Sequence, residues 1–92
     1  MKKITAFYLE GCPYCRQAKE ALKELKNENE KYSSVLIEWI EENQHPEISE
    51  KYDYYRVPSM FIENEKIYEA HRGEKFDECK ENVKKVLEAA MS

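Results

Sequence analysis

Residues 4–15 have the sequence ITAFYLEGCPYC, which is the most informative stretch of the chain. Residues 4–9 form a continuous apolar run with two aromatic side chains, which is typical of a buried strand. Residues 10–11 then turn the chain. Cys12 stands directly before an amphipathic stretch that opens with Pro13, a residue suited to the first turn of a helix. The order predicts a strand that leads into a Cys-x-x-Cys pair at the start of a helix.

The place of the first cysteine favours redox chemistry. The first N–H groups of a helix have no backbone partner, and the helix dipole adds partial positive charge at that end. A thiolate at Cys12 is therefore stabilised, and the thiolate is the reactive form of cysteine. Tyr14 is large and amphipathic, so we expect it at the lip of the site.

Composition limits the class of protein. The 92 residues are 41% hydrophobic and 37% charged, which predicts one globular domain over residues 1–92. The net charge of −4 disfavours nucleic acid as a partner. The apolar run behind residues 1–3 is too short for a signal peptide, and no segment approaches the length of a membrane span. We therefore expect a cytoplasmic protein, and in that compartment Cys-x-x-Cys favours catalysis over a structural disulfide. We also expect a monomer.

Hydrophobic periodicity predicts the elements that follow. The first helix carries apolar residues at the spacing of one helix face: Ala18, Ala21, Leu22 and Leu25. This helix fades through the polar residues 26–31, and residues 35–40 form a second strand. Pro46 predicts the start of a short helix, with Ile48 and Tyr52 on its apolar side.

The second half of the chain predicts a hairpin and a closing helix. Residues 57–62 form a third strand that begins near Pro58, where proline is tolerated. A tight turn at residues 64–65 leads to a fourth strand over residues 67–71, and Gly73 ends that strand. The closing helix carries apolar residues at spacings of three and four: Phe76, Cys79, Val83, Val86, Leu87 and Ala90.

The predicted order of elements is β-α-β-α-β-β-α. A helix joins the first two strands, so they should be parallel with a right-handed crossover. The last two strands should form an antiparallel hairpin. The fold class is therefore α/β, with a mixed four-stranded sheet and helices on both of its faces.

This order resembles that of the thioredoxin-fold redoxins. The front half is similar to dithiol glutaredoxins, whose active-site sequence matches residues 11–15, Gly-Cys-Pro-Tyr-Cys. The rear half is closer to thioredoxin over residues 40–43, 51–52 and 56–59. Cys-x-x-Cys alone is a weak indication of this family, and the Val57-Pro58 pair at the start of the third strand makes the resemblance more specific. The resemblance covers nearly the whole chain and implies a thioredoxin-like fold of glutaredoxin size.

The resemblance also implies roles for individual residues. Cys12 would be the nucleophile and Cys15 the resolving thiol. The Val57–Pro58 peptide bond would be cis, and Val57 would offer its backbone to a substrate strand. The residues expected to bind substrate are Pro13, Tyr14, Arg16, Val57, Pro58 and Arg72.

Departures from the two family patterns bear on the reductant. Residues 9–10 are Leu-Glu where glutaredoxins usually carry a basic residue, and residues 70–73 contain one glycine where a pair helps to hold glutathione. Arg72 alone could pair with a glutathione carboxylate, so we predict weak glutathione binding. From thioredoxin the chain differs at Gly11, which replaces a tryptophan, and at Ala6, which replaces a buried aspartate.

Taken together, the residues and the resemblance predict a thiol–disulfide oxidoreductase that reduces protein or small-molecule disulfides through Cys12 and Cys15. We expect no metal or bound cofactor, with reducing equivalents supplied by glutathione or by a flavoprotein disulfide reductase such as thioredoxin reductase. The expected partners are disulfide-containing proteins, with neither nucleic acid nor membrane among them.

Three alternatives remain open at this point. A structural zinc half-site would need four ligands, and Cys79, His45 and His71 supply no second pair. The other two are an iron–sulfur cluster shared across a dimer and a redoxin-fold module that docks a partner without turnover. Cys79 itself lies on the apolar stripe of the closing helix, which predicts a buried core residue.

Overall fold

The structure, a computed structural model, describes residues 1–92 and contains one four-stranded sheet with strand order β2-β1-β3-β4. The elements are β1 (Ile4–Tyr8), α1 (Pro13–Glu28), a 3-10 helix η1 (Glu30–Ser34), β2 (Ile37–Glu41), α2 (Pro46–Ser49), β3 (Ser59–Ile62), β4 (Glu65–Glu69) and α3 (Phe76–Met91). β1 and β2 are parallel, whereas the β1–β3 and β3–β4 pairs are antiparallel. The predicted order of elements and the mixed sheet are therefore confirmed.

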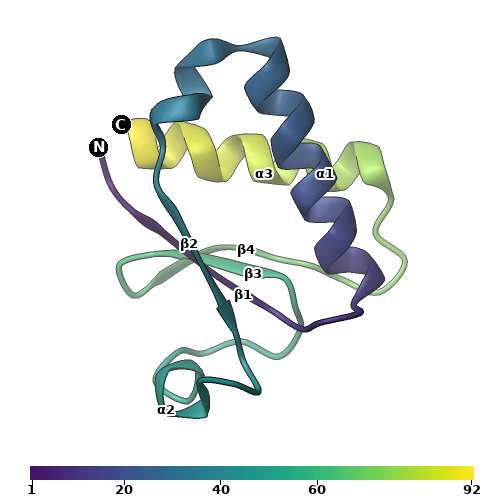
Figure 1. The fold of residues 1–92 in the computed structure, drawn as a ribbon, viewed down its shortest axis with the longest axis vertical. Helices are drawn as coiled ribbons and strands as arrows, with labels where there is room; N and C mark the ends of the chain where they lie inside the picture. The colour runs from purple at the N-terminus through teal and green to yellow at the C-terminus, as the bar shows by residue number, and fades with distance from the viewer.

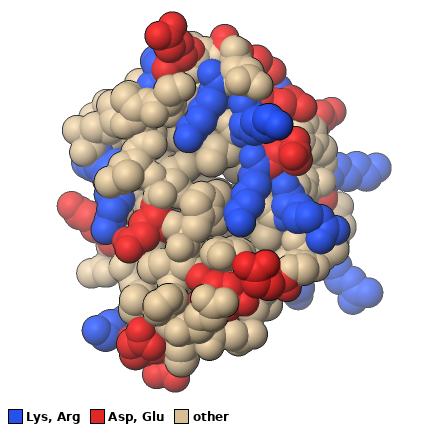
Figure 2. Space-filling model, viewed as in Figure 1, with Lys and Arg blue, Asp and Glu red and all other residues tan.

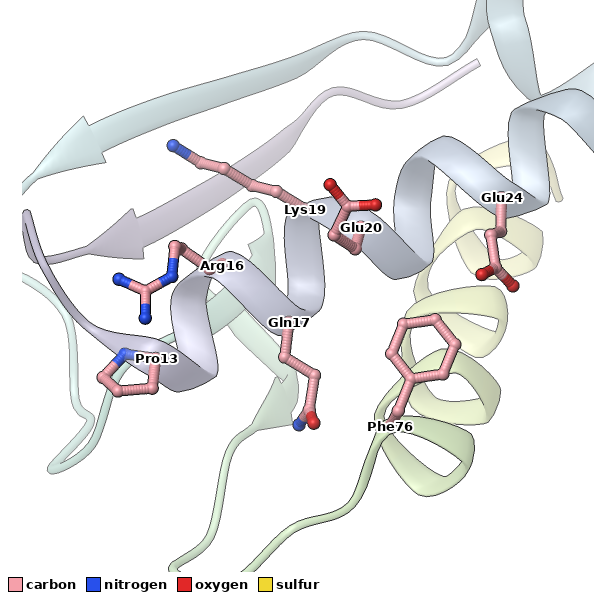
Figure 3. A pocket seen from close by; sticks show the side chains of 7 residues that line it. All are labelled: Pro13, Arg16, Gln17, Lys19, Glu20, Glu24 and Phe76. Carbon is pink, nitrogen blue, oxygen red and sulfur yellow. The ribbon is translucent and has the colours of Figure 1, made fainter.

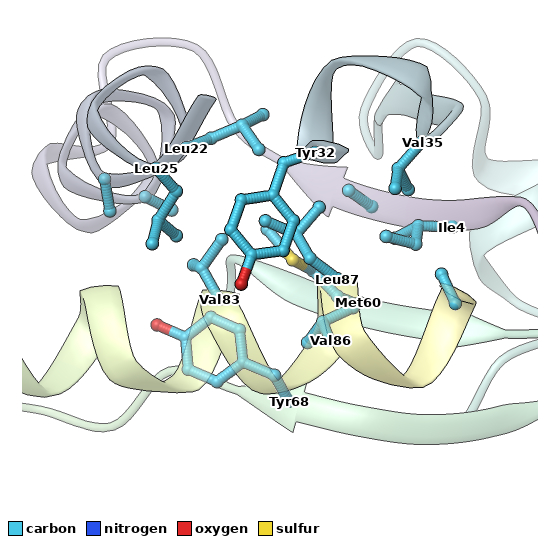
Figure 4. Close-up of a cluster of buried hydrophobic side chains, with 14 of the residues drawn as sticks. Ile4, Leu22, Leu25, Tyr32, Val35, Met60, Tyr68, Val83, Val86 and Leu87 are labelled. Carbon is cyan, nitrogen blue, oxygen red and sulfur yellow. The ribbon is translucent and has the colours of Figure 1, made fainter. Parts of the chain in front are cut away.

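The main core lies between the sheet and the helices α1 and α3, which share one face of the sheet (Figure 1). α1 contributes the apolar stripe that its spacing predicted, and α3 contributes the stripe that contains Cys79. Figure 4 shows part of this cluster, including Ile4, Leu22, Leu25, Tyr32, Met60, Val83 and Leu87. Tyr32 enters the cluster from η1, an element that the sequence analysis did not predict.

The opposite face of the sheet is covered by aromatic side chains more than by a helix. Phe7 and Phe61 are buried there, and the rings of Tyr52 and Tyr54 lie 4.8 and 4.9 Å from the Phe7 ring between centroids. α2 is only four residues long, and Tyr52 follows it rather than belonging to it. Tyr55 differs from its neighbours, because 89% of its surface is exposed.

Several predicted boundaries are wrong by one or two residues. β2 begins at Ile37 rather than at position 35, because η1 draws Val35 into the core and the Val35 N–H bonds the last turn of η1. The hairpin turn occupies residues 63–64 rather than 64–65, since Ile62 pairs with Glu65. β4 accordingly runs from position 65 to 69 and not from 67 to 71.

The topology brings three chain segments to one end of the sheet, where the two inner strands terminate. β1 ends and β3 begins there, because the two strands are antiparallel and Phe7 pairs with Ser59. α1 starts shortly after β1, so Cys12 lies at the same end of the sheet as Pro58, the residue just before β3. None of the helices combines the length and the apolar character that crossing a membrane requires.

Candidate active site

Cys12 is the N-cap residue of α1. Its backbone is extended, with φ −78° and ψ 118°, and its Sγ accepts the Cys15 N–H at 3.3 Å. A side-chain acceptor at this position normally satisfies one of the free N–H groups of the first helical turn, and here sulfur takes that part. The residue is half-exposed, so the sulfur at the positive end of the helix is open to an incoming disulfide.

Cys15 lies one turn behind Cys12 and is buried, with 2% of its surface exposed. Burial, together with its hydrogen bond to Cys12, raises the pKa of the Cys15 thiol well above its ordinary value. The Leu9 backbone and the Lys19 ammonium oppose this rise without cancelling it. At neutral pH the pair therefore consists of an accessible sulfur with a protonated thiol beneath it, and both cysteines are free in this structure.

The loop before β3 completes the predicted constellation. The Val57–Pro58 peptide bond is cis, as the resemblance implied, and the Val57 carbonyl oxygen lies 3.9 Å from the Cys12 Sγ. Pro58 is buried, and its carbonyl accepts the Ala70 N–H at 2.9 Å. The Val57 N–H donates no hydrogen bond within the protein, so it is available to an extended segment bound beside Cys12.

A carboxylate that the sequence analysis did not single out holds this loop. Glu69 on β4 accepts the N–H groups of Tyr55 and Arg56 at 2.7 and 2.6 Å. Although partial burial opposes ionisation, the Lys66 ammonium at 2.6 Å and these two N–H groups hold the pKa of Glu69 below its ordinary value. Glu69 therefore fixes the residues directly before Val57. Nothing in the local pattern of β4 marks this role, because the two backbone N–H groups that Glu69 binds lie more than ten residues away in the sequence.

A second buried carboxylate holds the turn before Cys12. Glu41, at the end of β2, is 7% exposed and accepts the N–H groups of Glu10, Asn43 and Gln44. The bond from Glu10, reinforced by the other two, lowers the pKa of Glu41. The carboxylate is thus ionised at neutral pH and ties the turn that precedes Cys12 to the end of the neighbouring strand.

Tyr14 links the cysteine motif to the loop between β4 and α3. Its hydroxyl oxygen accepts the Gly73 N–H at 2.7 Å, and Gly73 has a φ of 83°, a conformation that favours glycine. This places the β4–α3 loop beside the motif. Arg72 lies next to Gly73, exposed, and its guanidinium forms no hydrogen bond or ion pair with the rest of the chain.

An open groove of about 780 Å³ adjoins the motif (Figure 3). It is lined by Pro13, Arg16, Gln17, Lys19, Glu20, Glu24 and Phe76. The Arg16 guanidinium reaches back beside Pro13, whereas Lys19 points away toward the strands. The Lys19 Nζ lies 4.2 Å from the centroid of the Tyr8 ring, in cation–π geometry. The groove presents both cations and carboxylates.

Cys79 and a group of three titratable side chains lie outside the cysteine motif. Cys79 is fully buried on α3, as predicted, and the Tyr68 hydroxyl donates to its sulfur at 3.4 Å. His71, Glu74 and Glu78 lie close together, but Glu74 already accepts the Tyr68 hydroxyl and His71 already contacts Glu78. This group includes neither cysteine of the motif.

The chain matches one family model and resembles several solved structures. A family model described as a glutaredoxin-like domain (DUF836) matches residues 3–89. Thioredoxin 1 from the thermophilic eubacterium Thermosipho africanus TCF52B is 20% identical, with a TM-score of 0.59 over 98% of this chain and 99% of that one. A mutant thioredoxin from Halobacterium salinarum NRC-1 is 16% identical, with a TM-score of 0.58 over 97% and 74% of the two chains.

Human ERp44 in its zinc-bound form is also similar, at 17% identity and a TM-score of 0.58, but the 92% of this chain that aligns covers only 26% of ERp44. No curated protein matches the sequence. At these identities the likeness establishes the fold, and it confirms the predicted thioredoxin-like α/β architecture.

Proposed function

The chain belongs to the glutaredoxin-like domain family, and we propose that it is a thiol–disulfide oxidoreductase that acts through Cys12 and Cys15. One observation carries the proposal: the half-exposed Cys12 sulfur caps α1, with the buried Cys15 thiol one turn behind it and the Val57 carbonyl 3.9 Å away. An accessible sulfur at a helix N-terminus with a second thiol in reserve suits two-step disulfide exchange.

The proposed reaction begins with attack of the Cys12 thiolate on one sulfur of a substrate disulfide. A new S–S bond forms to Cys12, the substrate S–S bond breaks, and one substrate thiolate leaves and takes a proton from water. Cys15 then gives its proton to water and attacks the Cys12 sulfur, the bond between Cys12 and the substrate breaks, and the second substrate thiolate leaves and takes up a proton. The substrate gains two electrons, and the protein is left with a Cys12–Cys15 disulfide.

The surroundings of the dithiol support the order of these steps. Because burial raises the pKa of Cys15, this thiol stays protonated until the mixed disulfide has formed. The free N–H of Val57 and its carbonyl can pair with an extended substrate segment, as in the addition of a strand to a sheet edge. We further propose that Pro13, Tyr14, Arg16 and Arg72 border the bound substrate.

The protein needs no bound cofactor for this reaction, because both electrons reside on the two cysteines. Glutathione or a flavoprotein disulfide reductase would return the disulfide to the dithiol. The surroundings favour a dithiol reductant or a reductase, since Glu10 repels the carboxylates of glutathione and Arg72 is the one Lys or Arg between Lys66 and Lys75. Disulfide-containing proteins are the proposed substrates.

Reduction of insulin disulfides by the purified protein, run in parallel with glutathione plus its reductase and with thioredoxin reductase, tests the proposal. Cys12→Ser should abolish the reaction, whereas Cys15→Ser should accumulate a mixed disulfide that mass spectrometry detects. Cys79→Ala serves as the matched control, because Cys79 lies in the core away from the motif, and it should retain activity.

Two results would contradict the proposal. One is full activity of the Cys12→Ser variant, and the other is alkylation of Cys15 by iodoacetamide before Cys12. A visible-range absorbance spectrum of protein purified without oxygen separates the main alternative, because an iron–sulfur cluster is coloured and a dithiol is not.

A further inference from the structure

The exposed surface of α1 is divided lengthwise by charge. At about 100° per residue, Arg16, Lys19, Lys23 and Lys26 fall within an arc of about 80°, which we call the basic stripe. The carboxylates on α1 that face solvent lie on the adjoining arc: Glu20, Glu24 and Glu28. The remaining arc is the buried apolar face. In Figure 2 Lys and Arg side chains gather over α1.

The two charged arcs differ in what they bind within the protein. Lys80 of α3 pairs with both Glu24 and Glu28, so the fold supplies one cation to the acidic arc, while Glu20 has no ion pair. The four residues of the basic stripe form no ion pair with any carboxylate. A chain with a net charge of −4 thus keeps four neighbouring cations unneutralised on one helix.

The stripe also borders a hollow whose charged lining is entirely cationic. This hollow, of about 420 Å³, lies between α1 and Ser33 near the end of η1, and is lined by Lys19, Leu22, Lys23, Lys26, Asn27 and Ser33. Three lysines and two polar residues line it, and no carboxylate does. The groove at the motif end differs, because Glu20 and Glu24 line it beside Arg16.

The position of the stripe connects it to the dithiol. Arg16 lies one turn after Cys12, and its N–H bonds the Cys12 carbonyl at 3.1 Å. From Arg16 to Lys26 the stripe extends about 15 Å along the helix, the length of about five residues of extended chain. Lys19 is held in place over the rings of Tyr8 and Trp39.

We propose that the basic stripe is the docking surface for an acidic segment of the protein that exchanges its disulfide with Cys12. This inference rests on the proposed function, and it names the chemistry of the partner. An extended acidic segment laid along α1 would pair its carboxylates with the four cations while its disulfide lies at the Cys12 end. The net negative charge of the chain would repel a long polyanion such as nucleic acid. A short acidic segment would contact only the basic stripe and avoid this repulsion.

The test uses two disulfide-bonded peptides that differ only in a flanking run of about five residues, glutamate in one and glutamine in the other. The variant is Lys23→Glu/Lys26→Glu, which lies away from Cys12. The control is Lys84→Glu/Lys85→Glu on α3, which changes the net charge by the same amount on an exposed surface elsewhere. Thermal unfolding followed by circular dichroism confirms that both variants fold.

At low ionic strength the wild-type protein should reduce the glutamate peptide with a kcat/KM about tenfold above that of the glutamine peptide. High salt should remove this preference. The preference should vanish in Lys23→Glu/Lys26→Glu and persist in the control, while the glutamine peptide is reduced at nearly the same rate by all three proteins. Equal rates for the two peptides with the wild type, or an equal loss in the control, would overturn the proposal.

A cysteine-free, fluorescent glutamate peptide separates docking from catalysis. If neither disulfide were reduced but this peptide bound by anisotropy, and Lys23→Glu/Lys26→Glu abolished binding, the proposed function would be wrong while the docking surface stood. Absence of binding together with normal reduction of the glutamine peptide would reject the docking surface alone. A single-stranded oligonucleotide that bound the stripe more tightly than the peptide at the same salt would overturn the assignment to a protein partner.

Discussion

Replacing Glu69 with alanine should destabilise the protein and weaken its disulfide exchange together. The change removes the acceptor of the Tyr55 and Arg56 N–H groups, which are bound at 2.7 and 2.6 Å directly before the Val57–Pro58 bond. A hydrogen bond to a charged group contributes about 1.5–3 kcal/mol, and the exposure of this loop places each bond at the lower end. We expect a loss of about 3 kcal/mol in the free energy of unfolding.

Lys66→Ala is the matched control, because it removes the cation that pairs with Glu69 and leaves both backbone bonds in place. An exposed ion pair contributes at most about 1 kcal/mol, so this variant should be less affected. Urea unfolding measures both losses by linear extrapolation. In the disulfide-exchange assay, Glu69→Ala should lower kcat/KM by about tenfold, because the Val57 carbonyl would be slightly misplaced. Lys66→Ala should leave kcat/KM nearly unchanged.

The pH dependence gives an independent check on the same carboxylate. Because the folded-state pKa of Glu69 is lowered, its contribution is fully present above the unfolded-state value of about 4.5 and is lost as the pH falls through the folded-state pKa. The difference in stability between wild type and Glu69→Ala should therefore shrink below pH 4.5. A loss under about 0.5 kcal/mol at neutral pH, or an equal loss in Lys66→Ala, would refute the assigned role.

Four further measurements follow from the structure. Burial raises the pKa of the Cys15 thiol, so iodoacetamide should label Cys12 first at neutral pH and reach Cys15 at a useful rate only in alkaline solution; equal labelling at neutral pH would contradict this. Tyr14→Phe should cost about 0.5 kcal/mol and speed hydrogen exchange of the Gly73 N–H, which loses its acceptor; unchanged exchange would show that the bond is absent in solution. Leu87→Ala should cost about 2–5 kcal/mol in urea unfolding, because Leu87 is fully buried between α3 and the sheet; a loss below about 1 kcal/mol would mean that the core closes around the change. Reduction of a glutathionylated peptide should show no saturation in the submillimolar range, and saturation there would mean that Arg72 and its surroundings hold glutathione better than their charges suggest.

Local patterns were enough to predict the elements that carry strong periodicity. The apolar face of α1 and the stripe that contains Cys79 both follow the helical repeat, and both pack as predicted. The hairpin turn was placed one residue late, because Asn64 is the stronger turn residue in the sequence while Glu63 adopts the left-handed conformation, with φ 57°. η1 was missed because its one buried anchor, Tyr32, lies in an otherwise polar stretch.

The candidate site divides in the same way. Cys12, Cys15 and Pro58 could be named in advance because each belongs to a short motif with its own chemistry. Glu41 and Glu69 could not be named, because each carboxylate acts on backbone N–H groups that the fold brings to it, and side-chain type alone does not show which N–H groups those are. The basic stripe was open to prediction, since its spacing of three, four and three residues is visible in the sequence, but its lack of internal partners became evident only from the packing of Lys80.

The Cys12 sulfur has two roles: it caps the N-terminus of α1, and it is the atom proposed to react. Each bond that this sulfur forms during exchange alters its ability to accept the Cys15 N–H, so the first turn of α1 changes in stability as the chemistry proceeds. By thermodynamic linkage, a change that stabilises this helix end more in the reduced than in the oxidised protein favours the reduced protein by that difference. The exchange rate of the Cys15 amide proton with solvent should therefore change with the oxidation state of the dithiol, and it can be measured without any added label.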